Sequence, residues 1–386
     1  MSTFTESEER QELRAQVRKL ASGFGREYFA AKARAGEKTT DLWLAIGKAG
    51  YLGVNIPEEY GGGGGGIGDC AAVCEELAAM GCPLLMMVVS PAICGTVISR
   101  FGTEAQKHRW LPGLADGTST MAFAITEPDA GTNSHNITTT ATRDGDSWVL
   151  KGQKIYISGM DEAANVLVVA RTSDAKTGKL KPCLFVVPTD AAGLTYTPIP
   201  MEMVSPESQF QVFIDDVRLP ADALVGDEDA GLIQLFAGLN PERIMAASFS
   251  TGLARYALER AVDYVKQRSV FGAPIGSHQG LAHPLAQSKI EIELARLMTQ
   301  KASALYEAGD DMGAGEAANM AKYAAAEAAC DAVDRAVQAH GGNGVTQEYG
   351  VGGLIVAARA GRIAPVSREM ILNFVGMHSL GLPKSY

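Results

Sequence analysis

The spacing of apolar residues changes twice along this chain, and the order of those changes restricts the possible folds more than any other feature. Residues 8–117 carry apolar side chains at the three- and four-residue spacings of helices, as at Leu13, Val17 and Leu20. Residues 118–226 read instead as short strands separated by turn-forming Gly, Asp and Pro. Helical spacing then returns. A chain with this order combines helical layers with a sheet.

We therefore predict an α+β fold with an N-terminal helical domain (1–117), a central β-barrel-like domain (118–226) and a C-terminal antiparallel four-helix bundle (227–386). A chain of 386 residues is long enough for three such domains. The long predicted helices of the bundle are Pro241–Gln267, Leu281–Glu307 and Gly315–His340. Crevices between domains of this kind are frequent ligand sites.

Six consecutive glycines, residues 61–66, interrupt the first helical region. Glycine runs do not sustain a helix, so we expect a flexible turn here. A phosphate-cradling loop is the alternative interpretation. That alternative is disfavoured because no Lys followed by Ser or Thr comes after the glycines.

Charge and apolar runs exclude several classes of protein. The chain has 44 Asp and Glu against 34 Lys and Arg, a formal net charge of -10, which does not favour a nucleic-acid partner. Its N-terminus is polar and acidic and lacks the features of a secretory signal. The most apolar run, Pro83–Ile98, is shorter than a bilayer span and contains Pro91, so we expect a buried helical segment. We expect a cytoplasmic protein without a membrane span.

The cysteines are scattered and form no CxxC pair: Cys70, Cys74, Cys82, Cys94, Cys183 and Cys330. This spacing argues against a zinc ribbon or a redox dithiol. We expect reduced, mostly buried thiols and no metal site.

Several segments carry a resemblance that spans essentially the whole chain. They read, in order, LWLAIGKAGYLGVNIPEEYGG (42–62), MAFAITEPDAGTNS (121–134), KGQKIYIS (151–158), DDVRLP (215–220), RSVFG (268–272) and QAHGGNGVTQEYGV (338–351). Together they resemble the acyl-CoA dehydrogenase family. The resemblance implies a flavoenzyme with FAD as cofactor, which removes two hydrogens from the carbons α and β to a thioester.

The segment at 121–134 resembles one flavin-binding signature of that family. The resemblance implies that Phe123, Ile125 and Thr126 contact the flavin and its edge, and that Thr132 contacts the pyrophosphate or the acyl-CoA. Gly131 lets the backbone come close to a phosphate or the ribityl chain.

The segment at 151–158 resembles the second flavin-binding signature. Alternation along a strand places Tyr156 and Ser158 on one face and Ile157 on the other. The family usually has Trp where this chain has Tyr156, and commonly Thr where it has Ser158, whose hydroxyl would donate to the flavin ring. Without the surrounding motifs, a core aromatic followed by a surface Ser would be the simpler interpretation.

Two further sets match residues that bind FAD across a subunit boundary in the family: Arg268, Phe271 and Gln279, and Gln338, Gly341 and Gly342. The planar fork of an Arg suits a pyrophosphate, and paired glycines admit the adenosine end closely. The resemblance implies a homo-oligomer, a tetramer built as a dimer of dimers. In isolation, a pair of glycines more often marks a helix terminus.

The reaction requires a carboxylate within reach of the thioester α-proton. Much of the family supplies it from a loop near the C-terminus, but here that loop has Pro365 and Val366 near the expected position. Isovaleryl- and long-chain-type members supply a Glu from another helix, immediately before an Arg, and Glu242–Arg243 matches that arrangement. We predict Glu242 as the catalytic base, with Glu369 as its rival.

Two other roles depend on the same regions. By resemblance, Asn240 and Arg243 engage the CoA portion of the substrate. Seen alone, Asn240 would be a helix N-cap and Glu242 a first-turn acid, and this capping role can coexist with catalysis. Pro365 has no N–H, so we expect Val366 or Ser367 to donate to the developing enolate oxygen.

The predicted function is oxidation of an acyl-CoA to the trans-2-enoyl-CoA in fatty-acid and lipid metabolism, with electrons passed to an electron-transfer flavoprotein. Two alternatives stay open: a related flavin oxidase or monooxygenase that uses O2, and a non-catalytic CoA-binding scaffold. The acyl chain is also open. The stretch Met86–Val89 could line an adaptable apolar pocket, but buried methionines more often serve packing.

Overall fold

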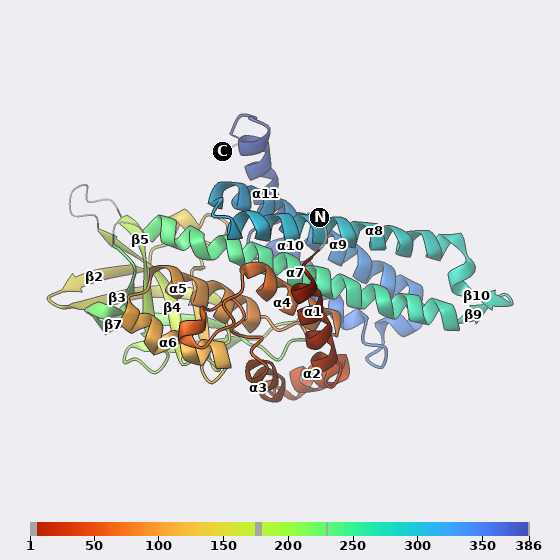
Figure 1. Ribbon diagram of the computed structural model, residues 1–386, viewed down its shortest axis with the longest axis horizontal. Coiled ribbons are helices and arrows are strands. Elements are labelled where there is room, and N and C mark those ends of the chain that lie inside the picture. The colour runs from red at the N-terminus through yellow and green to blue at the C-terminus, as the bar shows by residue number, and fades with distance from the viewer. Residues whose placement is uncertain (1–5, 174–179, 229–230, 385–386) are drawn as a thin grey trace.

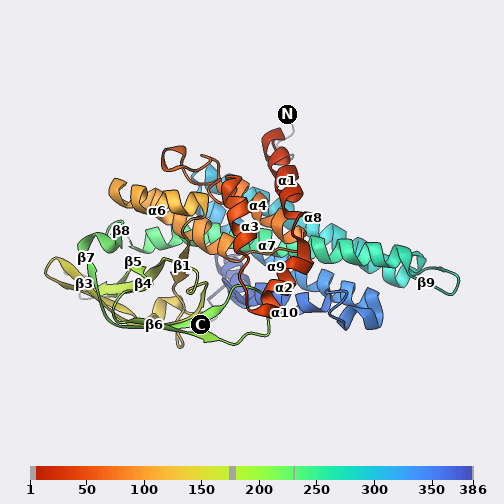
Figure 2. The ribbon, with the colours of Figure 1, turned by 90° about the horizontal axis from the view of Figure 1, so that it is seen from below.

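A computed structural model describes residues 6–173, 180–228 and 231–384. The sheet lies at one end of the molecule, and three long helices run from it to the other end (Figure 1). Figure 2 shows α6 on one side of the sheet and the long helices leading away from it. This arrangement confirms the α+β fold with helical regions before and after a central sheet.

The N-terminal region is helical, as predicted. Its helices are α1 (Glu8–Ala21), α2 (Gly25–Ala35), α3 (Thr40–Lys48), α4 (Ile67–Ala79), α5 (Thr96–Phe101) and α6 (Glu104–Asp116), with a π-helical segment, η2, at Val88–Gly95. Side chains define several ends: Ser7 caps α1, and Thr103 and Gln106 form a capping box on α6. Every residue of α4 except Asp69 is buried, as is all of η2, so these two segments form the centre of the region.

The glycine run forms an ordered turn in place of the flexible one that we expected. The N–H groups of Gly63, Gly64 and Gly65 donate to backbone carbonyls of residues 53–56. Because these amides already have partners, they cannot cradle a phosphate. The loop therefore serves to return the chain into α4.

The central strands form one twisted sheet in the order β6-β7-β3-β2-β4-β5-β8, with β1 paired to β4. The strands are β1 (Met121–Ala124), β2 (Thr140–Asp144), β3 (Ser147–Ser158), β4 (Asn165–Ser173), β5 (Leu180–Pro188), β6 (Leu194–Ile199), β7 (Gln209–Pro220) and β8 (Leu224–Val225). Among the described residues β6 and β8 do not pair, so the curved sheet stays open at these edges. Trp148, Phe185 and Phe210 belong to its own buried core.

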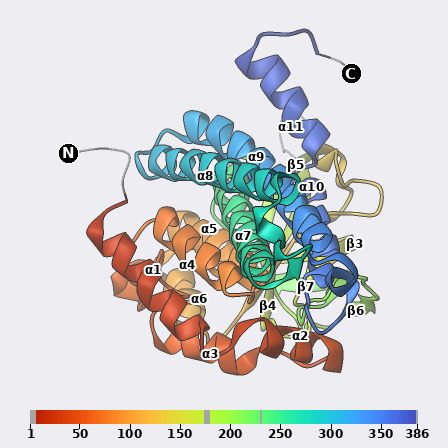
Figure 3. The same cartoon turned by 90° about the vertical axis from the view of Figure 1, so that its right-hand side faces the viewer.

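The C-terminal region is a bundle of α7 (Gly231–Gln267), α8 (Gln279–Glu307) and α9 (Asp311–His340), against which the short α10 (Ile355–Ile363) packs. A small hairpin of β9 (Ser269–Val270) and β10 (Ala273–Pro274) joins α7 to α8. The last helix, α11 (Arg368–Phe374), projects from the bundle (Figures 1 and 3). No helix among the described residues has the length and apolar character needed to cross a membrane.

The predicted start of α7 is wrong. We expected a helix to begin at Pro241, but α7 begins at Gly231 and continues through the proline. Pro241 has no N–H to donate to the carbonyl of Ala237, four residues earlier. The hydroxyl of Tyr306 on α8 donates to that carbonyl at 3.1 Å. A contact from another helix thus compensates for the missing intrahelical bond.

Candidate active site

The two predicted flavin-binding segments are held side by side. Phe123 is a buried residue of β1, and the half-buried Ile125 and Thr126 follow that strand. The N–H of Ile155 on β3 donates to the Thr126 carbonyl at 2.9 Å. Segments about thirty residues apart in the chain therefore present one continuous surface.

A buried ion pair, to which we assigned no role from the sequence, reinforces this junction. The Lys154 ammonium contacts the Glu127 carboxylate at 2.9 Å and the Ile125 carbonyl at 3.0 Å. Burial lowers the pKa of Lys154 to about 8, against the opposing charge of Glu127. Burial alone would raise the pKa of Glu127. The charge of Lys154 and the hydrogen bonds at Thr138 and Thr139 outweigh burial and lower this pKa to about 2. The pair is therefore ionised at neutral pH.

The end of β3 carries the predicted Tyr156, Ile157 and Ser158. A bulge between Lys154 and Ile157 interrupts the register with β7, and Tyr156 adopts a positive φ of 58°. Beyond the bulge the predicted faces are observed: Ile157 is buried, whereas Tyr156 is 57% exposed and Ser158 is partly so. The Ser158 hydroxyl donates to the Gln209 side-chain oxygen at 3.0 Å.

Gly131 and Thr132 lie on the exposed loop that follows β1. A Cβ added at Gly131 would meet no atom within 4 Å, so this stretch of backbone is open to a ligand. Gly341 and Gly342 are open in the same way, and Gly341 has a positive φ of 58°.

The remaining predicted FAD residues gather far from this surface. Arg268, Phe271, Gln279, Gln338, Gly341 and Gly342 lie where α7 ends, α8 begins and α9 ends. This is the end of the bundle opposite the sheet (Figure 1). Phe271, on the tip of the β9–β10 hairpin, is 97% exposed. The structure therefore brings the members of each set together but keeps the two sets apart within one chain.

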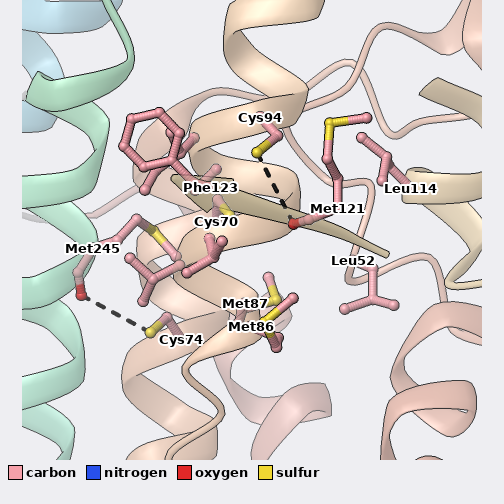
Figure 4. Close-up of a cluster of buried hydrophobic side chains, with 14 of the residues drawn as sticks. Leu52, Cys70, Cys74, Met86, Met87, Cys94, Leu114, Met121, Phe123 and Met245 are labelled. Carbon is pink, nitrogen blue, oxygen red and sulfur yellow. Dashed lines mark hydrogen bonds between the residues drawn. The ribbon is translucent and has the colours of Figure 1, made fainter. Parts of the chain in front are cut away.

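Glu242 lies in the interior of α7, so our interpretation of Asn240 as an N-cap and Glu242 as a first-turn acid is wrong. Met245, one helical turn further on, belongs to the same buried cluster as Phe123 and Cys94 (Figure 4). Glu242 lies near this cluster: the pKa of the Cys94 thiol is raised first by burial and then by the charge of Glu242.

The Glu242 carboxylate has no direct partner. It is half-buried, and no hydrogen bond or ion pair to it occurs within the part of the chain that the structure describes. Burial raises its pKa to about 7, although the charges of Arg243 and Lys322 oppose the shift. A carboxyl group with this pKa can accept a proton near neutral pH.

Arg243 and Asn240 turn toward their own protein. The Arg243 guanidinium donates to the Leu239 carbonyl at 3.2 Å and to the Asn240 side-chain oxygen at 3.3 Å, while its Nε is buried without a partner. The Asn240 amide donates to the Asp311 carbonyl at 3.1 Å and so ties α7 to the start of α9. Burial lowers the pKa of Arg243, against the charge of Glu242.

The C-terminal loop between α10 and α11 lies against α9. The Lys322 ammonium of α9 donates to the Val366 carbonyl, and the Ser367 side chain caps α11. The backbone N–H groups of Val366 and Ser367 donate to no other described residue. Glu369 lies exposed in the first turn of α11.

Lys322 was missed in the sequence, although a signal was present. It interrupts a run of alanines on α9, where Ala318, Ala325 and Ala329 at helical spacing are all buried. A lysine in an apolar stripe is an unusual choice, because a buried ammonium is costly.

Comparisons with known proteins agree along the whole chain. Models of the acyl-CoA dehydrogenase N-terminal, middle and C-terminal domains match residues 7–118, 122–217 and 229–380. The acyl-CoA dehydrogenase FadE12 of Mycobacterium tuberculosis is 67% identical over 385 residues, 100% of this chain and 99% of that protein. The long-chain specific acyl-CoA dehydrogenase of Sus scrofa mitochondria is 32% identical over 96% of this chain and 86% of its own length.

Solved structures give the same result. Butyryl-CoA dehydrogenase from Megasphaera elsdenii superposes with a TM-score of 0.92 at 29% identity, covering 98% of this chain and 100% of that one. A structure described as an FAD-dependent dehydrogenase superposes with a TM-score of 0.88 at 28% identity, covering 99% and 100%. The chain therefore belongs to the acyl-CoA dehydrogenase family of oxidoreductases.

Proposed function

We propose that this enzyme oxidises an acyl-CoA to the trans-2-enoyl-CoA and passes the electrons to an electron-transfer flavoprotein. Glu242 takes the proton from the α-carbon. The chemistry that FAD would supply, when bound, is an acceptor for the hydride that leaves the β-carbon. The two hydrogens thus leave as a proton and a hydride, and a carbon–carbon double bond forms. One observation carries the assignment of the base: Glu242 is a half-buried carboxylate with no direct partner among the described residues, its pKa raised to about 7, one helical turn from Met245 of the Phe123 cluster.

The residues fit FAD as the cofactor. The surface around Phe123, Thr126 and Tyr156 offers an apolar wall and hydroxyl groups to an isoalloxazine ring. The open backbone at Gly131 admits the ribityl chain or pyrophosphate. Thr132 stands beside it as a hydroxyl donor to the pyrophosphate or the substrate.

The substrate thioester needs stabilisation of its oxygen as the α-proton leaves. Val366 and Ser367 are candidates to donate to this oxygen, because their N–H groups have no acceptor among the described residues. Their loop is bound to α9 through Lys322, and α9 packs against α7, which carries Glu242. Arg243 and Asn240 contribute by fixing the shape of α7 around Glu242, since both side chains are engaged within the protein. The buried Met86 and Met87 of the Phe123 cluster are candidates for the acyl-binding wall (Figure 4).

We further propose that the enzyme is a homotetramer, a dimer of dimers, in which one chain supplies the Phe123 surface and its neighbour supplies Arg268 and Phe271 to the same FAD. The separation of the two sets within one chain supports this arrangement. A stripe of exposed apolar residues on α8, formed by Ile290, Leu294 and Leu297, also favours self-association. The units 1–117, 118–226 and 227–386 serve as its domains, and a cytoplasmic site in fatty-acid metabolism fits this function.

Anaerobic mixing of the FAD-loaded enzyme with straight, branched and ring-bearing acyl-CoAs tests the proposal. We expect the flavin absorbance to bleach with one class, and the enoyl-CoA to form in an amount equal to the reduced flavin. Bleaching that reverses rapidly in air would instead favour an oxidase or monooxygenase. Tight binding of acyl-CoA without bleaching by any member of the panel would favour a scaffold and contradict the proposal.

A further inference from the structure

Lys322 is a buried cation without a carboxylate partner. Its side chain is 2% exposed, and no Asp or Glu oxygen lies within ion-pair distance of it in the described ranges. Its hydrogen bond goes to the backbone carbonyl of Val366. A fold that needed only packing here would use another alanine or a leucine, because burying an ammonium with a single neutral partner is unfavourable.

The bond to Val366 has a geometric consequence for the next amide. The peptide between Val366 and Ser367 is trans, so its C=O and N–H point in opposite directions. With the carbonyl held by Lys322, the Ser367 N–H points away from α9. That N–H has no acceptor among the residues that the structure describes. Lys322 thus fixes a free donor in the loop that we propose for the thioester oxygen.

The charge of Lys322 also acts on Glu242. The charged groups around Lys322 are Glu242 and Arg243 on α7, Glu327 on α9 itself and Glu369 on α11. Burial and the charge of Arg243 lower the pKa of Lys322 to about 8, whereas the three carboxylates oppose that shift. Among the described residues, Glu242 is the one of these carboxylates that is half-buried and has no direct partner. Glu327 pairs with Arg362 at 2.8 Å, and Glu369 is exposed.

We propose that Lys322 is a positioning residue for the dehydrogenation, an inference that rests on the proposed function. It orients the Val366–Ser367 peptide so that the Ser367 N–H can donate to the thioester oxygen, and its charge favours the ionised form of Glu242 that accepts the α-proton. One buried cation therefore serves both the base and the oxygen site.

The test compares Lys322→Met, which keeps the length of the side chain but removes the charge and the donor, with Lys322→Arg, which keeps both. Lys289→Met, an exposed lysine on α8, is the matched control. The measurement is the rate of flavin reduction by a saturating acyl-CoA in a single turnover, between pH 5.5 and 9. For Lys322→Met we expect the limiting rate to fall about tenfold and the apparent pKa of the base to rise by about one unit. Lys322→Arg restores the pH profile, and Lys289→Met leaves it unchanged.

A purely structural role would give a different result. Lys322→Met would then lower FAD retention and thermal stability, while the enzyme that keeps its FAD would show the wild-type pH profile, which would overturn the inference. If Lys322→Met does not retain FAD, Lys322→Gln, which keeps a donor without the charge, takes its place with the same two outcomes. Failure of the wild-type flavin to bleach at any pH would instead contradict the proposed function.

Discussion

Two groups of charged residues include side chains of α7, and they differ in how their charges are paired. The first joins Glu75 and Glu76 of α4 to arginines of three other helices: Arg14, Arg255 and Arg296. Arg255 contacts both carboxylates, at 2.6 and 2.7 Å. Burial raises the pKa of Glu76, but the hydrogen bond and charge of Arg255 outweigh it, so the pKa is lowered.

The second group, Glu242, Arg243 and Lys322, has no such pairing. The charge of each member shifts the pKa of another. The hydrogen bonds of Arg243 and Lys322 nevertheless go to carbonyl and amide oxygens. The Glu242 carboxylate therefore keeps a raised pKa. Charges paired with one another stabilise the contact between helices, whereas charges left apart keep the ability to exchange protons.

The largest expected difference between the two groups is in catalysis. Glu242→Gln removes the base, so we expect flavin reduction by acyl-CoA to slow by about 10³-fold. Stopped-flow absorbance under anaerobic conditions measures the rate. The control is Glu369→Gln, which we expect to stay near the wild-type rate. A normal rate in Glu242→Gln together with a large loss in Glu369→Gln would transfer the role of base to Glu369.

The paired group should dominate stability. Glu76→Gln leaves the Arg255 and Arg14 guanidinium groups partly uncompensated in the interior, so we expect the free energy of unfolding to fall by about 3 kcal/mol. Denaturant unfolding of the FAD-loaded enzyme checks this. Asp144→Asn, which breaks an exposed pair with Arg218, should cost less than about 1 kcal/mol. Equal losses of unfolding free energy in the two variants would mean that the buried pairs stabilise the protein no more than exposed pairs do.

The pH dependence of catalysis reports on the unpaired group. Since the pKa of Glu242 is raised to about 7, the protonated, inactive form predominates below that pH. We expect kcat/KM to fall about tenfold per pH unit below pH 7. A profile that stays flat between pH 5.5 and 8 would show that the base titrates elsewhere.

The smallest expected effect is on stability: Glu242→Gln and Glu76→Gln should change the free energy of unfolding in opposite directions. A carboxyl whose pKa is raised on folding destabilises the protein once the pH exceeds its unfolded pKa, and this penalty is complete above the folded pKa of about 7. We therefore expect Glu242→Gln to raise the free energy of unfolding by about 1 kcal/mol at pH 8 and by almost nothing at pH 4.5. Thermal unfolding at the two pH values would measure it. A loss of stability at pH 8, as expected for Glu76→Gln, would remove the contrast.

The order of helices and strands followed from local spacing, and the predicted ends at Gln267, Glu307 and His340 agree with the structure. The beginning of α7 did not follow, because Pro241 stops a helix in isolation. The donor to the Ala237 carbonyl, which Pro241 leaves without its helical partner, is the hydroxyl of Tyr306, 69 residues after Ala237. A contact over this separation cannot be read from local sequence patterns.

The candidate site divides in a similar way. Motif residues such as Phe123 and Glu242 could be named from the sequence because their types and neighbours match a family pattern. The supporting ions, Lys154 and Lys322, could not be assigned roles, since their meaning depends on partners brought near by folding. For Lys154 the partner lies 27 residues away, and for Lys322 it lies 44 residues away.

The separation of Phe123 and Arg268 within one chain predicts complementation between inactive variants. If two chains share each FAD, a mixed dimer of a Phe123-defective chain and an Arg268-defective chain contains one site with both lesions and one site with neither. Two inactive variants, unfolded and reassembled together, would then recover activity that neither has alone. Such complementation would come from geometry alone, because Phe123 lies on the sheet domain, whereas Arg268 lies at the end of the bundle opposite the sheet.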